Sequence, residues 1–191
     1  MNVQEYNEQI KKLKEEEEKI NKKINELDRN GKFMESIILL PRVFEISNEI
    51  RRLQNELMFI KGPTYKDESI DLYYIENKSN EDEYYYDIYL SKTKINIGYI
   101  VYRNNNSIKR IGDIGYLIEE QYRHHSYAYK ALNLISKKIE ELNKEKIIIT
   151  TTIENIPSIK TIEKFGGNLI EKDKYNVLYF ECKIKNKNKT R

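Results

Sequence analysis

Apolar residues recur at alternating spacings of three and four along the N-terminal third of the chain. One series runs through residues 10–27 and a second through residues 43–60, and Asp28–Lys32 separates them. This period is typical of amphipathic helices. Two helical arms of similar length joined by a short loop are most simply an antiparallel, coiled-coil hairpin. The apolar positions of the two arms are Ile10, Leu13, Ile20, Ile24, Leu27, Val43, Ile46, Ile50, Leu53, Leu57 and Ile60.

The region between the two arms carries more apolar side chains than one pair of helices needs. Pro41 is expected in a first turn or at a kink, because proline lacks an N–H and clashes with the preceding turn. Either a second copy of the chain or the rest of the same chain would cover the surplus, and we favour a homodimer through the hairpin. The surplus residues are Phe33, Met34, Ile37, Ile38 and Leu40.

A turn signal at Gly62-Pro63 separates the helical pattern from short segments rich in Ile, Tyr and Val. We therefore expect a helical hairpin at residues 1–62 and a second domain at residues 63–191. The second domain is predicted to be α/β (α+β), with helices flanking a mixed, mostly antiparallel sheet. Strands are expected at Ser69–Ile75, Glu83–Ser91, Lys94–Arg103, Ile111–Ile118, Lys146–Thr152, Asn168–Glu171 and Asn176–Ile184, and helices at Ser126–Leu142 and Pro157–Phe165.

Composition narrows the classes of function. A chain of 191 residues that is 39% hydrophobic can hold one compact domain and an appendage. Its formal charge of +3 arises from 34 basic and 31 acidic residues, a near balance that does not predict nucleic-acid binding. The single cysteine, Cys182, excludes an intramolecular disulfide. No apolar leader or membrane-spanning stretch is evident, so we expect a cytoplasmic protein with no membrane partner.

The most informative stretch joins an apolar strand to the long amphipathic helix, and it reads Y-R-H-H-S-Y-A-Y-K-A from Tyr122 to Ala131. Such a turn places backbone N–H groups and a helix N-terminus where a pyrophosphate could bind. His124 and His125 have no other His or Cys nearby, so they are a poor metal site, and no metal is predicted.

This stretch resembles the phosphate-binding turn of the GNAT acyltransferase superfamily. The family turn commonly reads R-G-x-G-Y-A, and here it reads R-H-H-S-Y-A, so Arg123, Tyr127 and Ala128 fit while His124 and Ser126 replace glycines. A serine Cβ takes some of the space that glycine leaves for phosphate, although its hydroxyl can cap the helix or donate to phosphate.

The resemblance extends without a gap from about Ile95 to Ile170. Asn155-Ile156-Pro157-Ser158 matches the family motif N-x-x-S, and the following helix ends in the family's K-x-G at Lys164-Phe165-Gly166. The strand G-D-I-G-Y and the ending G-G resemble a bacterial branch of predicted acetyltransferases. The chain as a whole thus looks like a GNAT domain with an added N-terminal hairpin.

The resemblance implies an acetyl-CoA-dependent N-acetyltransferase, in which a primary amine of a small molecule or a protein attacks the thioester directly. Two alternatives stay open: a weak or inactive CoA-binding module, and an interaction protein that works through its hairpin. The resemblance assigns Leu117, Ile118 and Glu119 to the pantetheine arm, and Arg123, His124, His125, Ser126, Tyr127, Ala128 and Tyr129 to the pyrophosphate. It also implies that Asn155 and Ser158 bind the cofactor, with Asn155 contacting the pantetheine arm or bracing the separated strands. For Asn155, a helix N-cap is an equally good interpretation.

Proton transfer is less fully specified. In many relatives a carboxylate near Asp113 is the general base, although Asp113 could instead pair with a lysine, and Glu119 is a second candidate. Relatives often carry a tyrosine acid where this chain has Ile162; Tyr175 or Tyr179 could substitute, and no acid is assigned. The family also inserts two helices between its first two strands, whereas only Glu76–Asp82 separates them here. Either the hairpin walls the acceptor cleft or the cleft is open.

Overall fold

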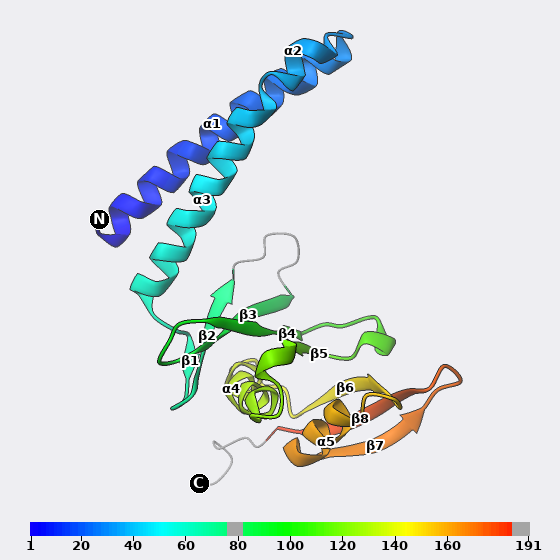
Figure 1. Ribbon diagram of the computed structural model, residues 1–191. Helices are drawn as coiled ribbons and strands as arrows, with labels where there is room; N and C mark the ends of the chain where they lie inside the picture. Colours follow the sequence, from blue (N-terminus) through cyan, green and yellow to red (C-terminus); the bar gives the residue numbers. More distant parts are fainter. Residues whose placement is uncertain (76–81, 185–191) are drawn as a thin grey trace. The chain divides into compact units, whose positions relative to one another are not determined.

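The computed structural model describes residues 1–75 and 82–184. Contacts between residues divide the chain into two compact units, Met1–Gly62 and Pro63–Arg191 (Figure 1). The first unit is helical and the second holds the sheet, so each unit has its own hydrophobic core. Along the part of the chain that the structure describes, no helix is both long and apolar enough to cross a membrane.

The first unit is a helical hairpin. Helix α1 (Val3–Arg29) packs against α3 (Leu40–Lys61), and the short helix α2 (Phe33–Ile37) lies between them in the chain. Pro41 lies in the first turn of α3, as expected, where its missing N–H costs nothing. The sequence pattern did not predict α2 as a separate helix. The buried hydrophobic residues of the hairpin are Tyr6, Ile10, Ile46, Ile50, Leu53 and Leu57.

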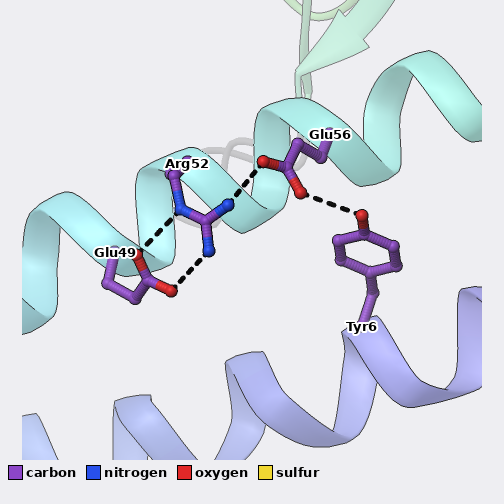
Figure 2. Close-up of polar contacts among 4 residues, drawn as sticks. All are labelled: Tyr6, Glu49, Arg52 and Glu56. Carbon is purple, nitrogen blue, oxygen red and sulfur yellow. Dashed lines mark hydrogen bonds and ion pairs between the residues drawn. The ribbon is translucent and has the colours of Figure 1, made fainter. Parts of the chain in front are cut away.

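Polar contacts set how α1 and α3 lie against each other. The Tyr6 hydroxyl donates to Glu56 at 2.8 Å, and Arg52 donates to the other oxygen of Glu56 at 2.6 Å and to Glu49 at 2.6 and 2.9 Å (Figure 2). Because Tyr6 in the first turns of α1 meets Glu56, Ile60 lies one turn farther along α3 and is 50% exposed. The predicted apolar series therefore includes Ile60, which lies beyond the buried contact between α1 and α3, and omits Tyr6, which is part of that contact.

The second unit is built on one eight-stranded sheet with the order β1-β2-β3-β4-β5-β6-β8-β7. All neighbouring strands are antiparallel except β5 and β6, which are parallel. The mixed, mostly antiparallel sheet confirms the predicted fold class. The strands are β1 (Tyr65–Lys66), β2 (Ile70–Ile75), β3 (Glu83–Leu90), β4 (Asn96–Arg103), β5 (Ile114–Ile118), β6 (Lys146–Thr152), β7 (Gly167–Lys172) and β8 (Val177–Lys183).

Two local differences from the predicted elements have a clear cause. β5 begins at Ile114 rather than Ile111, because Lys109–Ile111 forms a short 3-10 helix and Gly112 takes a left-handed conformation with φ 65°. β1 was not predicted, since two residues are too few to show an alternation. Residues 76–81, which belong to the short connection between β2 and β3, lie outside the described residues.

Helix α4 (Tyr127–Glu141) follows β5, and α5 (Ile156–Phe165) follows β6. The predicted apolar face of α4 is buried, and its side chains share one core with β2, β3, β4, β5, β6, β8 and α5. α4 and α5 also contact each other. The segment between β5 and α4 is therefore fixed at both ends by elements anchored in this core. The buried residues of α4 are Ala131, Leu132, Leu134, Ile135 and Ile139.

Candidate functional site

The strands β5 and β6 are joined at one end only. Their parallel ladder pairs Ile114 with Ile149 within the described strands. Just before it, the Asp113 N–H donates to the Ile148 carbonyl at 2.6 Å, and the Asp113 carboxylate accepts the Ile148 N–H at 2.7 Å. At Gly112 a Cβ would lie 3.0 Å from backbone atoms of β6, so this glycine permits the close approach. Beyond Ile114, toward the end of β5, a split opens between the two strands.

Backbone groups of β5 face this split. The Glu119 N–H donates to the Ile97 carbonyl at 2.9 Å, so Glu119 directs its backbone toward β4. Because hydrogen bonding alternates along an antiparallel pair, Leu117 also bonds toward β4, whereas Tyr116 and Ile118 direct their N–H and C=O groups toward β6. Of the three residues expected along the pantetheine arm, Ile118 has its backbone on the split side, and Tyr116 joins it.

The turn after β5 has an unusual backbone. A short 3-10 helix, Glu120–Tyr122, leads to Arg123, whose Nε donates to the Ile118 carbonyl at 3.0 Å. His124 and Ser126 then have φ 67° and 61°. Non-glycine residues rarely adopt left-handed conformations, which favour glycine. These two residues therefore hold the backbone geometry that glycine would give the turn.

The first turn of α4 contains backbone N–H groups that precede the first hydrogen bond of the helix. The first intrahelical bond runs from the Lys130 N–H to the Ser126 carbonyl at 3.0 Å, so the N–H groups of Tyr127, Ala128 and Tyr129 precede it. The Ser126 side chain caps none of them, unlike the capping role considered for it. Uncapped N–H groups at a helix start combine with the helix dipole to favour an anion.

A cation lies beside these donors. Lys164, near the end of α5, places its Nζ 4.5 Å from the centroid of the Tyr129 ring. The rings of His125 and Tyr127 lie 5.5 Å apart, so His125 also stays next to the turn. The sequence motif K-x-G contains Lys164, but the motif alone gave no reason to place its charge here. Among the described residues, no group of three or more His, Cys, Asp or Glu side chains could hold a metal ion.

The N-x-x-S motif splits into two roles. The Asn155 side-chain Oδ1 accepts the Ser158 N–H at 3.2 Å, so Asn155 is the N-cap of α5. The Ser158 hydroxyl lies 2.8 Å from the Tyr116 hydroxyl and so links α5 to β5. Sequence reasoning missed Tyr116. Strand alternation with Ile114 and Ile118 was the signal that placed it on the helix-covered face.

The two predicted carboxylates have different surroundings. Burial raises the pKa of Asp113, and the hydrogen bond from the Ile148 N–H opposes that rise. The Asp113 carboxylate is thus bound to the backbone of β6 rather than to a lysine. Glu119 is exposed at the start of the turn, where it accepts a bond from Gln121 at 2.9 Å. The general-base roles of Asp113 and Glu119 stay predictions.

Comparison with known proteins identifies the family. A model described as "Acetyltransferase (GNAT) domain" matches residues 40–168. The chain belongs to the GNAT acetyltransferase family. The family resemblance found in the sequence is therefore confirmed. The GNAT match begins in α3 and ends in β7, so it includes the split, the phosphate turn and the N-x-x-S motif.

Solved structures share this GNAT fold at low identity. A GNAT-family acetyltransferase from Bacillus anthracis is 22% identical, with a TM-score of 0.45, 52% of this chain covered and 65% of that chain. A spermidine N-acetyltransferase from Vibrio cholerae, solved with CoA and spermine, is 18% identical, with a TM-score of 0.47 and coverages of 55% and 67%. A domain from Methanocaldococcus jannaschii DSM 2661 gives 22%, 0.49, 55% and 69%. No curated protein sequence matches the chain.

The left-handed serine of the turn gives a stability prediction. Ser126→Gly should stabilise the protein by about 0.5–1 kcal/mol, because glycine removes the cost of a side chain at φ 61°. Ser136→Gly in the middle of α4 is the matched control and should destabilise it by about 0.5 kcal/mol or more. Urea unfolding of the two variants measures both effects. Equal destabilisation by both substitutions would contradict the strain at Ser126.

The bridge between β5 and β6 gives a prediction of pH dependence. Because the folded-state pKa of Asp113 is raised, the folded protein binds more protons than the unfolded chain just above pH ~4, and stability falls as the pH rises through this window. Asp113→Asn keeps an oxygen for the Ile148 N–H and should remove this dependence. Asp113→Leu should cost about 1–3 kcal/mol by leaving that N–H unpaired. Urea unfolding between pH 4 and 8 measures the stability of each variant as a function of pH. Parallel curves for the wild type and Asp113→Asn would contradict the predicted role of Asp113 in this pH dependence.

Proposed function

We propose that the protein transfers an acetyl group from acetyl-CoA to a primary amine, and that β5, the turn after it and α5 hold the cosubstrate. The observation that carries this proposal is the one-ended split between β5 and β6, which leads into an uncapped helix N-terminus. A long thioester with a pyrophosphate needs both features at once. The pantetheine arm, which carries amides, requires a gap with backbone donors and acceptors. The pyrophosphate dianion requires clustered N–H groups.

The residues present fit the pyrophosphate. The N–H groups of Tyr127, Ala128 and Tyr129 would bind its oxygens, and Lys164 would add a positive charge beside them. Arg123 keeps its Nε on the Ile118 carbonyl, which fixes the guanidinium at the edge of the turn. The left-handed backbone at Ser126 supports the fit, because it preserves the turn geometry although the glycine is absent.

The residues along the split fit the pantetheine arm. The outward backbone groups of Tyr116 and the Ile118 N–H would bond to its amides, as an additional strand would, while the Ile118 carbonyl stays bonded to Arg123. Asn155 would contribute indirectly, by fixing the start of α5 through its cap on Ser158. At the closed end, Asp113 would brace β5 against β6 and set the depth to which the arm enters. Glu119, exposed at the open end next to the turn, is the second candidate for the base that takes a proton from an incoming amine.

The acceptor would approach from the other face of the sheet. Leu117 and Tyr99 pair across β4 and β5, point away from the helix-covered core, and are 43% and 42% exposed. β2 and β3 pair with each other, and the connecting residues 76–82 are too few in number for two helices. The exposed apolar surface near the split would suit the aliphatic part of a small or protein-borne amine.

We further propose that the hairpin joins two copies of the chain. Large apolar side chains in α2 and at the start of α3 stay exposed, among them Met34 at 75% and Phe44 at 69%. Charges beside them are partly compensated within the hairpin: Arg42 pairs with Glu16 at 2.8 Å and with Glu45 at 3.2 Å. Two identical hairpin ends could therefore pack with reduced like-charge repulsion.

Binding of the cosubstrate tests the main proposal. Acetyl-CoA should bind the wild type with micromolar affinity, and Ser126→Trp should weaken binding by at least tenfold because the indole fills the phosphate turn. Ser107→Trp, in an exposed loop at the opposite end of β5, is the matched control and should bind normally. Isothermal titration calorimetry measures all three. Absence of binding up to millimolar acetyl-CoA would refute the proposal and favour an interaction protein that acts through its hairpin. Binding of acetyl-CoA without acetyl transfer to any amine would favour an inactive CoA-binding module.

Self-association tests the second proposal. The wild type should show concentration-dependent dimerisation in sedimentation equilibrium, and a Met34→Glu/Phe44→Glu variant should be monomeric because it buries charge in the interface. Ile60→Glu, at the far end of α3, should still dimerise. A wild type that stays monomeric at all accessible concentrations would show that the exposed apolar tip does not bind another copy.

A further inference from the structure

Two cations of the second unit gather on one exposed aromatic ring. The connection from β4 to β5 lies beside the turn that joins β7 to β8 (Figure 1). The Arg110 Cζ lies 4.4 Å from the centroid of the Tyr175 ring, and the Lys174 Nζ lies 5.1 Å from the same centroid. Tyr175 is 58% exposed, so both charges border solvent. The ring attracts each cation through its face and so holds two like charges close together.

No carboxylate neutralises these two cations. Within the residues that the structure describes, neither Arg110 nor Lys174 forms an ion pair, whereas the adjacent Lys109 pairs with Glu171 at 2.6 Å. The two segments that meet here, residues 109–111 and 171–176, carry a net positive charge. They contain four cations and two carboxylates, namely Lys109, Arg110, Lys172, Lys174, Glu171 and Asp173.

The second carboxylate of this region is already engaged. Asp173 accepts the backbone N–H groups of Tyr175 at 2.8 Å and Val177 at 2.9 Å, and the Tyr179 hydroxyl at 3.3 Å. These bonds fix the turn between β7 and β8, and with it the Tyr175 ring. The guanidinium and the ammonium on that ring therefore keep N–H groups that a further anion can accept from.

The segment that carries Arg110 borders the split between β5 and β6. The Thr150 hydroxyl donates to the Arg110 carbonyl at 3.1 Å. Thr150 follows Ile149, which pairs with Ile114 where β5 and β6 are still joined. Ile149 faces the core, so strand alternation places Thr150 on the opposite face of the sheet, here called the outer face. Arg110 is thus anchored on the outer face where the split begins.

The same segment crosses β8 on this outer face. The Lys109 Nζ lies 5.2 Å from the centroid of the Tyr179 ring. Leu178 and Phe180 point into the core, so Tyr179 between them points outward. The outer face is also the side from which the proposed function brings the acceptor, past Leu117. The paired cations on Tyr175 therefore lie along one side of the acceptor's path.

We propose that the acceptor is a peptide in which acidic side chains follow the reactive amine, and that Arg110 and Lys174 bind those acids. This inference rests on the proposed function. Neighbouring strands lie about 4.8 Å apart, so an anion bound beyond β6 and β8 is roughly 10 Å from the split. An extended chain covers this distance in about three residues at ~3.3 Å each. Most free amino acids carry their amine and carboxylate much closer together.

A purely solvating role for the two cations makes a different prediction. If Arg110 and Lys174 only cover the Tyr175 ring, acidic and neutral peptides should bind equally. If they bind the acceptor, affinity should depend on acidic side chains, and the dependence should disappear when these two charges are removed. A pair of peptides that differ only in charge separates the two roles.

The experiment uses two peptides with a fluorescent label at the carboxyl end, Ala-Lys-Gly-Asp-Glu-Asp and its neutral counterpart Ala-Lys-Gly-Asn-Gln-Asn. Fluorescence anisotropy of the full chain with saturating CoA should show about fivefold tighter binding of the acidic peptide, a modest ratio because the ion pairs are exposed to solvent. In Arg110→Gln/Lys174→Gln the two peptides should bind equally. Lys137→Gln/Lys160→Gln removes two exposed charges from α4 and α5 and should keep the wild-type ratio.

Mass spectrometry of both peptides after incubation with acetyl-CoA gives a second measure. The wild type should acetylate the acidic peptide about fivefold faster, and Arg110→Gln/Lys174→Gln should lose this preference. Equal affinities in the wild type, or a preference that survives in Arg110→Gln/Lys174→Gln, would overturn the inference. A preference lost in the control variant as well would also overturn it, because net charge alone would then explain the binding.

Two further outcomes separate this inference from the proposed function. Free aspartate that displaces the acidic peptide as well as the unlabelled peptide does would overturn the peptide class of acceptor and leave the acetyl-CoA site intact. Failure to bind acetyl-CoA in calorimetry, with the preference for the acidic peptide retained, would overturn the acceptor role together with the proposed function.

Discussion

The divergence of β5 from β6 is the constraint on which the rest of the site depends. Parallel neighbours in a sheet ordinarily stay paired along their length, and here the pairing is held by Asp113 and Ile148 at one end. From this point the strands separate, so the backbone groups of Tyr116 and the Ile118 N–H are not bonded to β6, while the Ile118 carbonyl accepts the Arg123 Nε–H. The same geometry directs the chain into the turn that begins α4. One bridge thus sets both the gap and the position of the helix N-terminus.

The turn shows how a backbone conformation can persist after its usual residue has changed. His124 and Ser126 occupy left-handed conformations, and each costs on the order of 1–2 kcal/mol relative to glycine. Structure on both sides maintains them: β5 is fixed in the sheet, α4 is fixed by its buried face, and Arg123 closes the loop onto Ile118. Strain of this kind is common where a binding geometry is preserved. The turn thus keeps the backbone geometry that the proposed binding of pyrophosphate requires.

Much of the fold could be predicted from the sequence, because strong periodicity specifies long elements. The apolar stripe of α4 and the Ile-, Tyr- and Val-rich segments of β3 and β4 led to the correct helices and the correct class of sheet. Boundaries that depend on a single residue were not predicted. Gly112 makes β5 shorter than expected, and the buried contact between α1 and α3 ends near the Tyr6–Glu56 hydrogen bond, before Ile60. These details depend on which residues meet in space, and no local pattern encodes that.

The site was less predictable for the same reason. Family motifs located the turn and α5, but contacts across elements decide what each side chain does. Asp113 bonds to β6, Asn155 caps α5, and Lys164 reaches the first turn of α4. Tyr116 is the sharpest case, because its partner Ser158 is 42 residues away in sequence. A motif can therefore locate an element of the site, whereas the fold decides which side chains of that element meet which partners.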